Sequence, residues 1–265
     1  MGFLEGVVAQ VRRRLAADPL DVERLRRAAA GAPAPRPWAA ALRARPLAVI
    51  AEVKRASPSA GPIASPDPVA QALAYARGGA AAISVLTEPD HFHGSLQDLV
   101  AVRAGVDLPV LRKDFLVAPS QVVQARAAGA DAVLVIASAV DDDELRALLE
   151  EAAAWGLGVL LETHGDDDLE RALGTDAEVI GVNARDLETL AVDPAAARAR
   201  LRAIPQDRVA VLESGIATRA DVEAARRAGA SAILVGEALM RAPDPSAMVR
   251  ELLDPAPPSR EEPSR

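Results

Sequence analysis

The chain of 265 residues has no cysteine, three Phe, two Trp and one Tyr, and only two lysines among its 30 Lys and Arg residues. Without cysteine there is no disulfide framework, no thiolate metal site and no thiol nucleophile, which is typical of a reducing compartment. With 2% aromatic residues the core must consist of Ala, Val, Leu and Ile, which suits helices packed on parallel strands. The scarcity of aromatics also argues against a stacking surface for nucleic acid.

Charge and hydropathy favour a cytoplasmic protein without membrane contact. The formal net charge of −8 gives no general face for polyanions, so an anionic substrate needs a local cluster of cations and backbone amides. At the amino terminus Glu5 precedes Arg12, the reverse of the basic-then-apolar order of a secretory signal. No apolar run approaches the length that crosses a bilayer.

Three rare polar residues, Lys54, Lys113 and Asn183, each stand at the end of a strand-like apolar run. Arg supplies the positive charge everywhere else in the chain. A lysine is therefore expected where a compact cation that can give up a proton is required.

Eight short apolar runs alternate with Ala-rich amphipathic segments, which predicts parallel strands alternating with helices. The runs are Ala48–Val53, Ala81–Leu86, Leu108–Leu111, Ala132–Ala137, Gly158–Leu161, Glu178–Val182, Val209–Leu212 and Ala232–Val235. Helix starts are indicated at Asp141 and Thr218. Gly79, Gly129 and Gly229 each follow a helix, where glycine adopts the left-handed conformation that ends it.

Eight such units predict an α/β fold of the (β/α)₈ TIM barrel type rather than an open doubly wound sheet. No GxGxxG motif opens a helix, which further disfavours a dinucleotide fold. We expect an N-terminal extension of one or two helices at residues 1–46, the barrel at residues 47–254 and a disordered tail at residues 255–265.

Polar residues follow almost every predicted strand, at the barrel face that carries chemistry in this fold. Glu52 and Lys54 lie two residues apart and share a face of their strand, as do Lys113 and Phe115. A structural ion pair between Glu52 and Lys54 remains an alternative to a catalytic role.

Two segments after the last predicted strands, Leu212–Ala217 and Leu234–Leu239, stand where such barrels bind phosphate through backbone N–H groups. Their glycines, Gly215 and Gly236, would let an anion approach the backbone, although glycines in this position also make simple tight turns. The long loop after the first strand, residues 55–66, suits a lid, in which Ser57 is a candidate anion contact.

Seven segments, taken together, carry a specific family signature. They are Ile50–Gly61, Ser84–Glu88, Leu111–Val117, Leu161–His164, Ile180–Leu187, Leu212–Ile216 and Leu234–Met240. In order and register they resemble the indole-3-glycerol phosphate synthase family of tryptophan biosynthesis.

The resemblance implies a carboxy-lyase that uses neither a metal nor an organic cofactor. It would close the ring of 1-(2-carboxyphenylamino)-1-deoxyribulose 5-phosphate, with loss of CO₂ and water, to give indole-3-glycerol phosphate. The reaction turns a ketone into an alkoxide, so an ammonium acid and a carboxylate held away from water are the expected equipment. Association with other tryptophan-pathway enzymes stays open.

The resemblance also assigns roles. Lys113 corresponds to the general acid for the ribulose carbonyl and Glu162 to its acid/base partner in the dehydration, with Glu52 and Asn183 in support. Lys54 corresponds to the cation that meets the substrate carboxylate and is a candidate proton shuttle. The matches that bind substrate are Ser57, Pro58, Phe92, Phe115, Arg185, Glu213, Ser214, Gly215, Gly236 and Glu237. One departure is Ala238, where many relatives have Ser.

Three alternatives remain. His91 and His93 form an HxH pair, as in metal-dependent hydrolases, but such enzymes carry the pair at the end of the first strand, which here ends in Glu and Lys. Phosphoribosylanthranilate isomerase is similar in its phosphate loops but uses a cysteine base, which this chain lacks. A binding barrel without catalysis is the third, and the presence of Lys113 and Glu162 argues against it.

Overall fold

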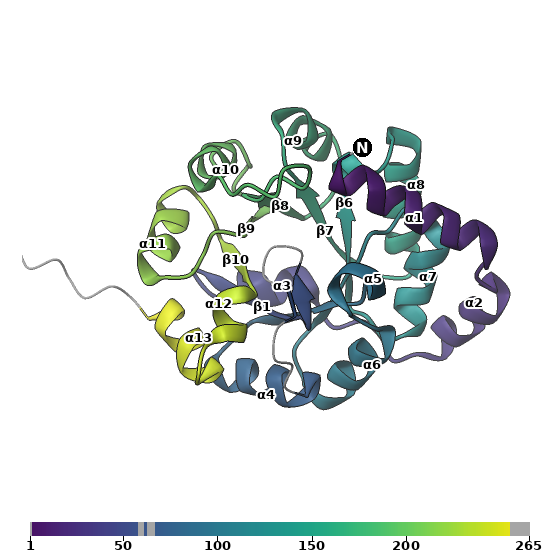
Figure 1. Cartoon of the computed structure of the whole chain (residues 1–265), viewed down its shortest axis with the longest axis horizontal. Helices are drawn as coiled ribbons and strands as arrows, with labels where there is room; N and C mark the ends of the chain where they lie inside the picture. Colours follow the sequence, from purple (N-terminus) through teal and green to yellow (C-terminus); the bar gives the residue numbers. More distant parts are fainter. Residues whose placement is uncertain (1, 58–60, 63–66, 255–265) are drawn as a thin grey trace, which may run out of the picture.

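The computed structural model describes residues 2–57, 61–62 and 67–254, and these form a closed barrel of parallel strands ringed by helices (Figure 1). The strand order is β1-β10-β9-β8-β7-β6-β5-β4, and pairing of β4 with β1 closes the ring. The predicted (β/α)₈ fold is confirmed. Pro58 and the tail predicted at residues 255–265 lie outside the described residues.

Each predicted apolar run overlaps one barrel strand, with ends that differ by up to two residues. The barrel strands are β1 (Ala48–Val53), β4 (Ala82–Leu86), β5 (Val110–Lys113), β6 (Ala132–Ile136), β7 (Gly158–Thr163), β8 (Val179–Asn183), β9 (Val209–Glu213) and β10 (Ala232–Val235). Four of them continue past the last apolar residue, to Lys113, Thr163, Asn183 and Glu213. The hydrogen bonds between strands are made by the backbone and do not depend on side-chain polarity. The polar residues therefore lie within the strands, and their side chains alternate between the two faces of the sheet.

A small antiparallel hairpin, which the sequence did not predict, occupies part of the loop after β1. Its strands are β2 (Ala56–Ser57) and β3 (Gly61–Pro62), paired between Ser57 and Gly61. Ser57 therefore belongs to a strand, and its side chain lies outside the described part of the structure.

Most helices cover the outside of the barrel, whereas α5 and α12 contribute to the cavity described below. The helices after β1 are α4 (Pro68–Gly78), α5 (Pro89–Phe92), α6 (Leu96–Gly105), α7 (Pro119–Ala127), η1 (Ala137–Ala139), α8 (Asp142–Ala154), α9 (Asp166–Leu173), α10 (Pro194–Leu201), α11 (Arg219–Arg227), α12 (Glu237–Arg241) and α13 (Pro245–Leu253). Asp141 and Thr218 are the N-caps of α8 and α11. Gly79, Gly129 and Gly229 adopt φ of 97°, 86° and 100°, as predicted.

Before β1 the chain forms three helices, α1 (Phe3–Ala17), α2 (Val22–Gly31) and α3 (Trp38–Arg43), instead of the one or two expected. The third was missed because six residues after a Pro-rich stretch show no helical period. It is stabilised by burial of Trp38 and Leu42. Helix α1 runs along the barrel rim close to α8 (Figure 1). There Arg12 pairs with Glu144 of α8 at 2.6 Å.

The barrel interior is apolar along most of its length, and its polar residues collect at the carboxyl ends of the strands. All residues of β1, β4, β6, β8, β9 and β10 are buried. Leu134 of β6 and Leu234 of β10 point inward and form the floor of the cavity described below. Among the described residues, no helix is both long enough and apolar enough to cross a membrane.

Candidate active site

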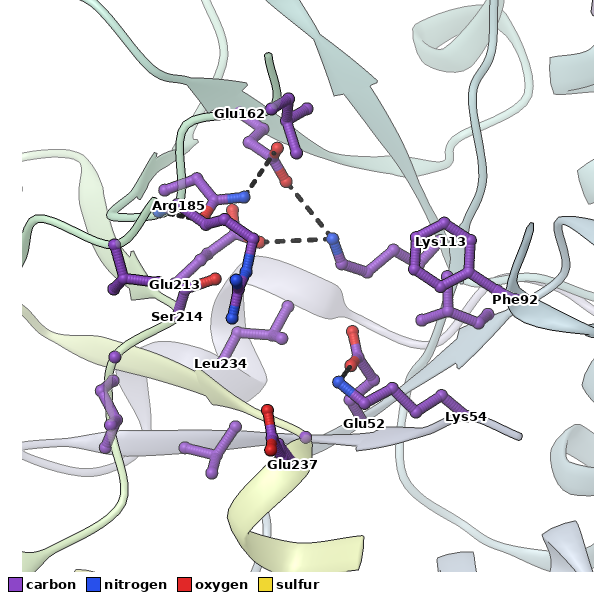
Figure 2. A pocket seen from close by; sticks show the side chains of 18 of the residues that line it. Glu52, Lys54, Phe92, Lys113, Glu162, Arg185, Glu213, Ser214, Leu234 and Glu237 are labelled. Atoms are coloured by element: carbon purple, nitrogen blue, oxygen red, sulfur yellow. Dashed lines mark hydrogen bonds and ion pairs between the residues drawn. The ribbon is translucent and has the colours of Figure 1, made fainter. Parts of the chain in front are cut away.

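A cavity of about 520 Å³ opens at the carboxyl ends of the barrel strands (Figure 2). All predicted site residues except Ser57 and Pro58 line it: Glu52, Lys54, Phe92, Lys113, Phe115, Glu162, Asn183, Arg185, Glu213, Ser214, Gly215, Gly236 and Glu237. Strand alternation points Glu52, Lys113, Glu162, Asn183 and Glu213 into this space, and the loops and helices that follow the strands bring in the others.

Lys113 reaches across the cavity to two buried carboxyl groups. Its Nζ lies 3.4 Å from Glu162 Oε2 and 3.6 Å from Glu213 Oε2, and both glutamates are only 1% exposed (Figure 2). Together with Glu52, these residues come from β5, β7, β9 and β1, which are alternate strands of the barrel. TIM-barrel interiors are built in such layers of four, so these four residues form one charged layer.

The charges in this layer shift one another's pKa. Burial alone would lower the pKa of Lys113, but the carboxylates of Glu162, Glu213 and Glu52 raise it above its ordinary value. Burial opposes charge on Glu162 too, yet the Lys113 ammonium lowers the pKa of Glu162 below its usual range. Burial and repulsion from Glu162 raise the pKa of Glu213 well above its usual value. The surroundings therefore favour the ionised form of Glu162 and disfavour the ionised form of Glu213.

Asn183 links the charged layer to the loop after β8. Its Nδ2 donates to Glu162 Oε1 at 3.1 Å, and its Oδ1 accepts from the backbone N of Arg185 at 3.0 Å. The Arg185 guanidinium donates to the Leu190 carbonyl at 2.9 Å, which holds it at the cavity mouth. The only asparagine of the chain thus orients Glu162 and, two residues on, the start of the loop.

Lys54 and Glu52 form a second charged pair on the opposite wall. Lys54 Nζ lies 2.9 Å from Glu52 Oε1, so the ion pair considered as an alternative exists, but both residues face the cavity. Gly236 lies directly against this pair, because a Cβ at that position would overlap Glu52 Oε1 and come within 2.9 Å of Lys54 Nζ. The buried Tyr75 Oη donates to the backbone carbonyl of Glu52 at 3.2 Å.

A buried network beneath Lys113 fixes its backbone. The Arg112 guanidinium pairs with Asp114 at 2.8 Å, and Thr87 Oγ1 donates to the same carboxylate at 2.7 Å. Arg112 also donates to the Gln121 carbonyl at 2.9 Å, which ties the end of β5 to α7. These side chains are nearly inaccessible to water, so the segment that carries Lys113 is held before any substrate arrives.

The loops after β9 and β10 have backbone conformations suited to close contact with an anion. Ser214 and Gly215 are both left-handed, with φ of 64° and 70°. Such a conformation strains a serine but not a glycine, so it marks Ser214 as a position held by its surroundings. Gly236 and Glu237 begin the short helix α12 on the same side of the cavity.

The apolar wall of the cavity includes a residue that sequence reasoning did not find. The rings of Phe92 and Phe115 lie 6.3 Å apart, and Phe3 of α1 joins the cavity lining. No local pattern distinguishes Phe3 from other apolar residues of an amphipathic helix. Phe92 is positioned by Glu88, whose carboxylate accepts from three backbone N–H groups at the start of α5.

The two histidines of the HxH pair do not converge on a site. His91 packs edge-on against Phe3, with ring centroids 5.4 Å apart, and its Nε2 lies 3.2 Å from Gln10 Oε1. His93 adopts φ of 53° at the end of α5. Within the described ranges, no group of three or more His, Asp or Glu side chains is arranged to hold a metal ion.

A second hollow lies away from the charged layer, toward the amino ends of the strands. It has a volume of about 1040 Å³ and is bordered by Trp38, α8 and the loop before β8. Its acidic and basic side chains balance, and Arg43 and Arg171 are paired with Glu178 and Asp142. Chemistry in this fold gathers at the carboxyl face, so the first cavity is the candidate active site.

Comparison with known proteins decides the family. Residues 4–252 match the family model described as indole-3-glycerol phosphate synthase. The chain belongs to the indole-3-glycerol phosphate synthase family. A protein of that name from a Nocardioides species is 51% identical over 255 residues, covering 95% of this chain and 98% of the relative. One from Mycolicibacterium vanbaalenii is 49% identical over 252 residues, covering 95% and 92%.

Solved structures with lower identity support the fold alone. A 3-hexulose-6-phosphate synthase superposes with a TM-score of 0.60 at 22% identity, covering 78% of this chain and 98% of its own. A thiamine phosphate pyrophosphorylase from Pyrococcus furiosus gives a TM-score of 0.59 at 17% identity, covering 80% and 96%. The barrel is thus common to several chemistries, and the family is distinguished by the residues that line its cavity.

Proposed function

We propose that the chain catalyses the decarboxylating, dehydrating ring closure of 1-(2-carboxyphenylamino)-1-deoxyribulose 5-phosphate to indole-3-glycerol phosphate, with Lys113 as the general acid. As a member of its family it acts on a phosphorylated small molecule in tryptophan biosynthesis. The observation that carries the proposal is the Lys113 ammonium, 3.4 Å from Glu162 and 3.6 Å from Glu213 inside the cavity at the carboxyl ends of the strands.

The substrate has three parts, and each has a matching region in the cavity. The aromatic ring packs against Phe92 and Phe115, and its carboxylate meets the Lys54 ammonium. The phosphate lies on the backbone N–H groups near Gly215 and Gly236, where the absence of a Cβ permits close approach. Ser57, Pro58, Arg185, Ser214 and Glu237 complete the contacts to carboxylate, ring, hydroxyls and phosphate. Binding both ends holds the ring carbon against the ketone between them.

In the first step the ring carbon that bears the carboxylate attacks the ribulose ketone. A new carbon–carbon bond forms, the carbonyl π electrons move to oxygen, and Lys113 delivers a proton there to give a hydroxyl group. Lys113 is charged before the step because surrounding carboxylates raise its pKa, and the developing alkoxide is a stronger base than the amine left behind. Because Lys113 is already held in position, no reorientation of the donor is needed during the step, whereas water molecules would have to reorient around the developing alkoxide.

Loss of CO₂ follows, and the electrons of the broken carbon–carbon bond restore the aromatic ring. The apolar wall formed by Phe92 and Phe115 favours this step, because it replaces a charged carboxylate by a neutral gas. Lys54 holds the carboxylate until that point. Its partner Glu52 then retains the ammonium in place.

Dehydration completes the indole. Glu162 accepts the proton from the chain carbon next to nitrogen, while Lys54 donates a proton to the hydroxyl group that leaves as water. The proton on Glu162 then restores the Lys54 ammonium, so the one proton consumed overall is the one from Lys113. Glu162 is suited to accept a proton because the Lys113 ammonium lowers its pKa and keeps it ionised. Once Lys113 has given up its proton and is neutral, the pKa of Glu162 is no longer held low, and the carboxylate becomes a stronger base.

Turnover of the anilino-deoxyribulose phosphate, followed by indole absorbance, tests the proposal in the wild type and in Lys113→Ala. We expect activity in the wild type and its near-complete loss in a folded variant, by about 10²–10⁴-fold. Retained activity in the variant would remove the acid assigned here. A wild type that binds the substrate without turning it over would indicate a binding barrel.

We further propose that the chain works in the cytoplasm on this substrate alone, without nucleic acid, membrane, metal or organic cofactor, and that contacts with other tryptophan-pathway enzymes are open to it. The division into residues 1–46, the barrel at 47–254 and a tail is likewise a proposal. Because Phe3 lines the cavity, the extension contributes to the same site as the barrel.

A further inference from the structure

His164, which the sequence reasoning gave no role, lies against the carboxylate proposed as acid/base. It follows β7 two residues after Glu162, and its Nε2 is 3.1 Å from Glu162 Oε1. It is absent from the cavity lining, so it reaches the site only through that carboxylate. We propose that His164 is a positioning residue that holds Glu162 so that Oε2 faces Lys113 and the substrate. This inference rests on the function proposed above for Glu162.

The two oxygens of Glu162 have separate partners. Oε1 is contacted by Asn183 Nδ2 and by His164 Nε2, each at 3.1 Å, whereas Oε2 faces Lys113 Nζ at 3.4 Å. The last torsion of a glutamate is soft, and at 1% exposure no bulk water orients the carboxylate. With Asn183 alone on Oε1, the group could rotate about one contact. Two contacts on the same oxygen define which oxygen is presented to the reaction.

His164 is itself held in place by the start of α9. Asp168 Oδ2 accepts from the backbone N of His164 at 3.1 Å and from that of Gly165 at 3.5 Å. His164 Nδ1 lies 4.0 Å from the same oxygen. The imidazole therefore sits between the carboxylates of Glu162 and Asp168, with only 13% of its side chain exposed.

The contact with Glu162 differs from ordinary packing. Both ring nitrogens of His164 are buried, and neither makes an aligned hydrogen bond within the described structure, although buried polar groups normally do. Its closest polar partner is the Glu162 carboxylate. Hydrogen bonds of unliganded active sites are often poorly aligned and tighten when substrate binds.

Three substitutions test whether position 164 must carry an N–H donor or only a side chain of similar size. His164→Gln keeps an N–H near the place of Nε2, His164→Asn keeps one that is too short to reach Glu162, and His164→Leu has none. Thr163→Val is the matched control, because Thr163 is buried in the same strand and donates to the Gly181 carbonyl at 2.8 Å, away from Glu162. Steady-state kinetics with the anilino-deoxyribulose phosphate gives kcat and KM for each purified variant.

We expect His164→Leu and His164→Asn to lower kcat roughly tenfold with KM changed less than about twofold, since the close contact of a ring nitrogen with the Glu162 carboxylate is lost. His164→Gln should stay within about threefold of the wild type, and Thr163→Val should keep its kcat. Equal kcat in the Gln and Asn variants, or a change confined to KM, would overturn the positioning role. That comparison stands even if His164→Leu does not fold.

A second measurement does not depend on turnover. Titration of the Glu162 carboxyl by carbon-13 NMR should show a higher pKa in His164→Asn than in His164→Gln. The other titratable groups facing Glu162, Lys113 and Glu213, are the same in both variants. An inactive wild type would overturn the proposed function, whereas identical Glu162 titrations in the two variants would overturn the role of His164.

Discussion

Removing the Lys113 ammonium should make the stability of the barrel depend on pH. In Lys113→Met the apolar volume of the side chain is largely kept, but Glu162 and Glu213 lose the cation that they share at 3.4 and 3.6 Å. In the wild type this ammonium holds the pKa of Glu162 low. Without it, burial raises the pKa of Glu162 as it already does that of Glu213.

The direction of the pH dependence follows from the raised pKa. A carboxyl whose pKa is higher in the folded than in the unfolded state stabilises the fold at low pH, and this contribution is lost as pH rises through the folded value. The variant should therefore be close to the wild type at pH 4.5 and less stable at pH 8. An uncompensated buried charge costs about 3–5 kcal/mol, which lowers Tm by roughly 6–20 °C in a chain of this size.

Thermal unfolding followed by circular dichroism at both pH values measures the effect. The double variant Lys113→Met, Glu162→Gln is the control, because it removes the buried charge along with its partner and should recover most of the stability at pH 8. An equal loss of Tm at the two pH values would refute the electrostatic reasoning. So would a double variant no more stable than the single one.

Three further predictions concern single contacts. Glu162→Gln should lower kcat by about 10²–10³-fold in steady-state kinetics with little change in KM, and a change in KM alone would contradict its acid/base role. Gly236→Ala should lower kcat as well as raise KM for the phosphorylated substrate, because the Cβ of the new alanine would displace Glu52 and Lys54. If the same assay shows a change in KM alone, the role of Gly236 is limited to phosphate binding. Asp114→Ala should reduce the free energy of unfolding, measured in urea, by about 3–5 kcal/mol, because the buried Arg112 guanidinium loses its carboxylate partner. A loss below about 1 kcal/mol would show that water takes the place of that carboxylate.

Much of the barrel was predictable because its signals are local. Apolar runs of strand length, capping residues such as Asp141 and Thr218, and a left-handed glycine after a helix each depend on neighbours in the sequence. Helix α3 was missed because it has no such local signal. Its six residues carry no period, and burial of Trp38 under the barrel is what stabilises it.

The identity of the polar residues at the strand ends was also visible in the sequence. Lys113, Glu162 and Asn183 were found there because they interrupt apolar runs and because Lys and Asn are otherwise so rare. His164 and Phe3 gave no such signal. One is an ordinary polar residue after a strand and the other an apolar residue of an amphipathic helix, and only their neighbours in space distinguish them.

The sequence by itself thus determined the repeat, the strands and the kinds of chemical group available at their ends. Only the tertiary structure decided which groups meet. Glu52, Lys113, Glu162 and Glu213 are far apart along the chain, and it is closure of the barrel with alternate strands in one layer that brings them together. Their separations then set the electrostatics. Interaction between charges depends on distance and burial, so the pKa of Glu162 falls below its usual range while that of Glu213 rises above it, although both are glutamate.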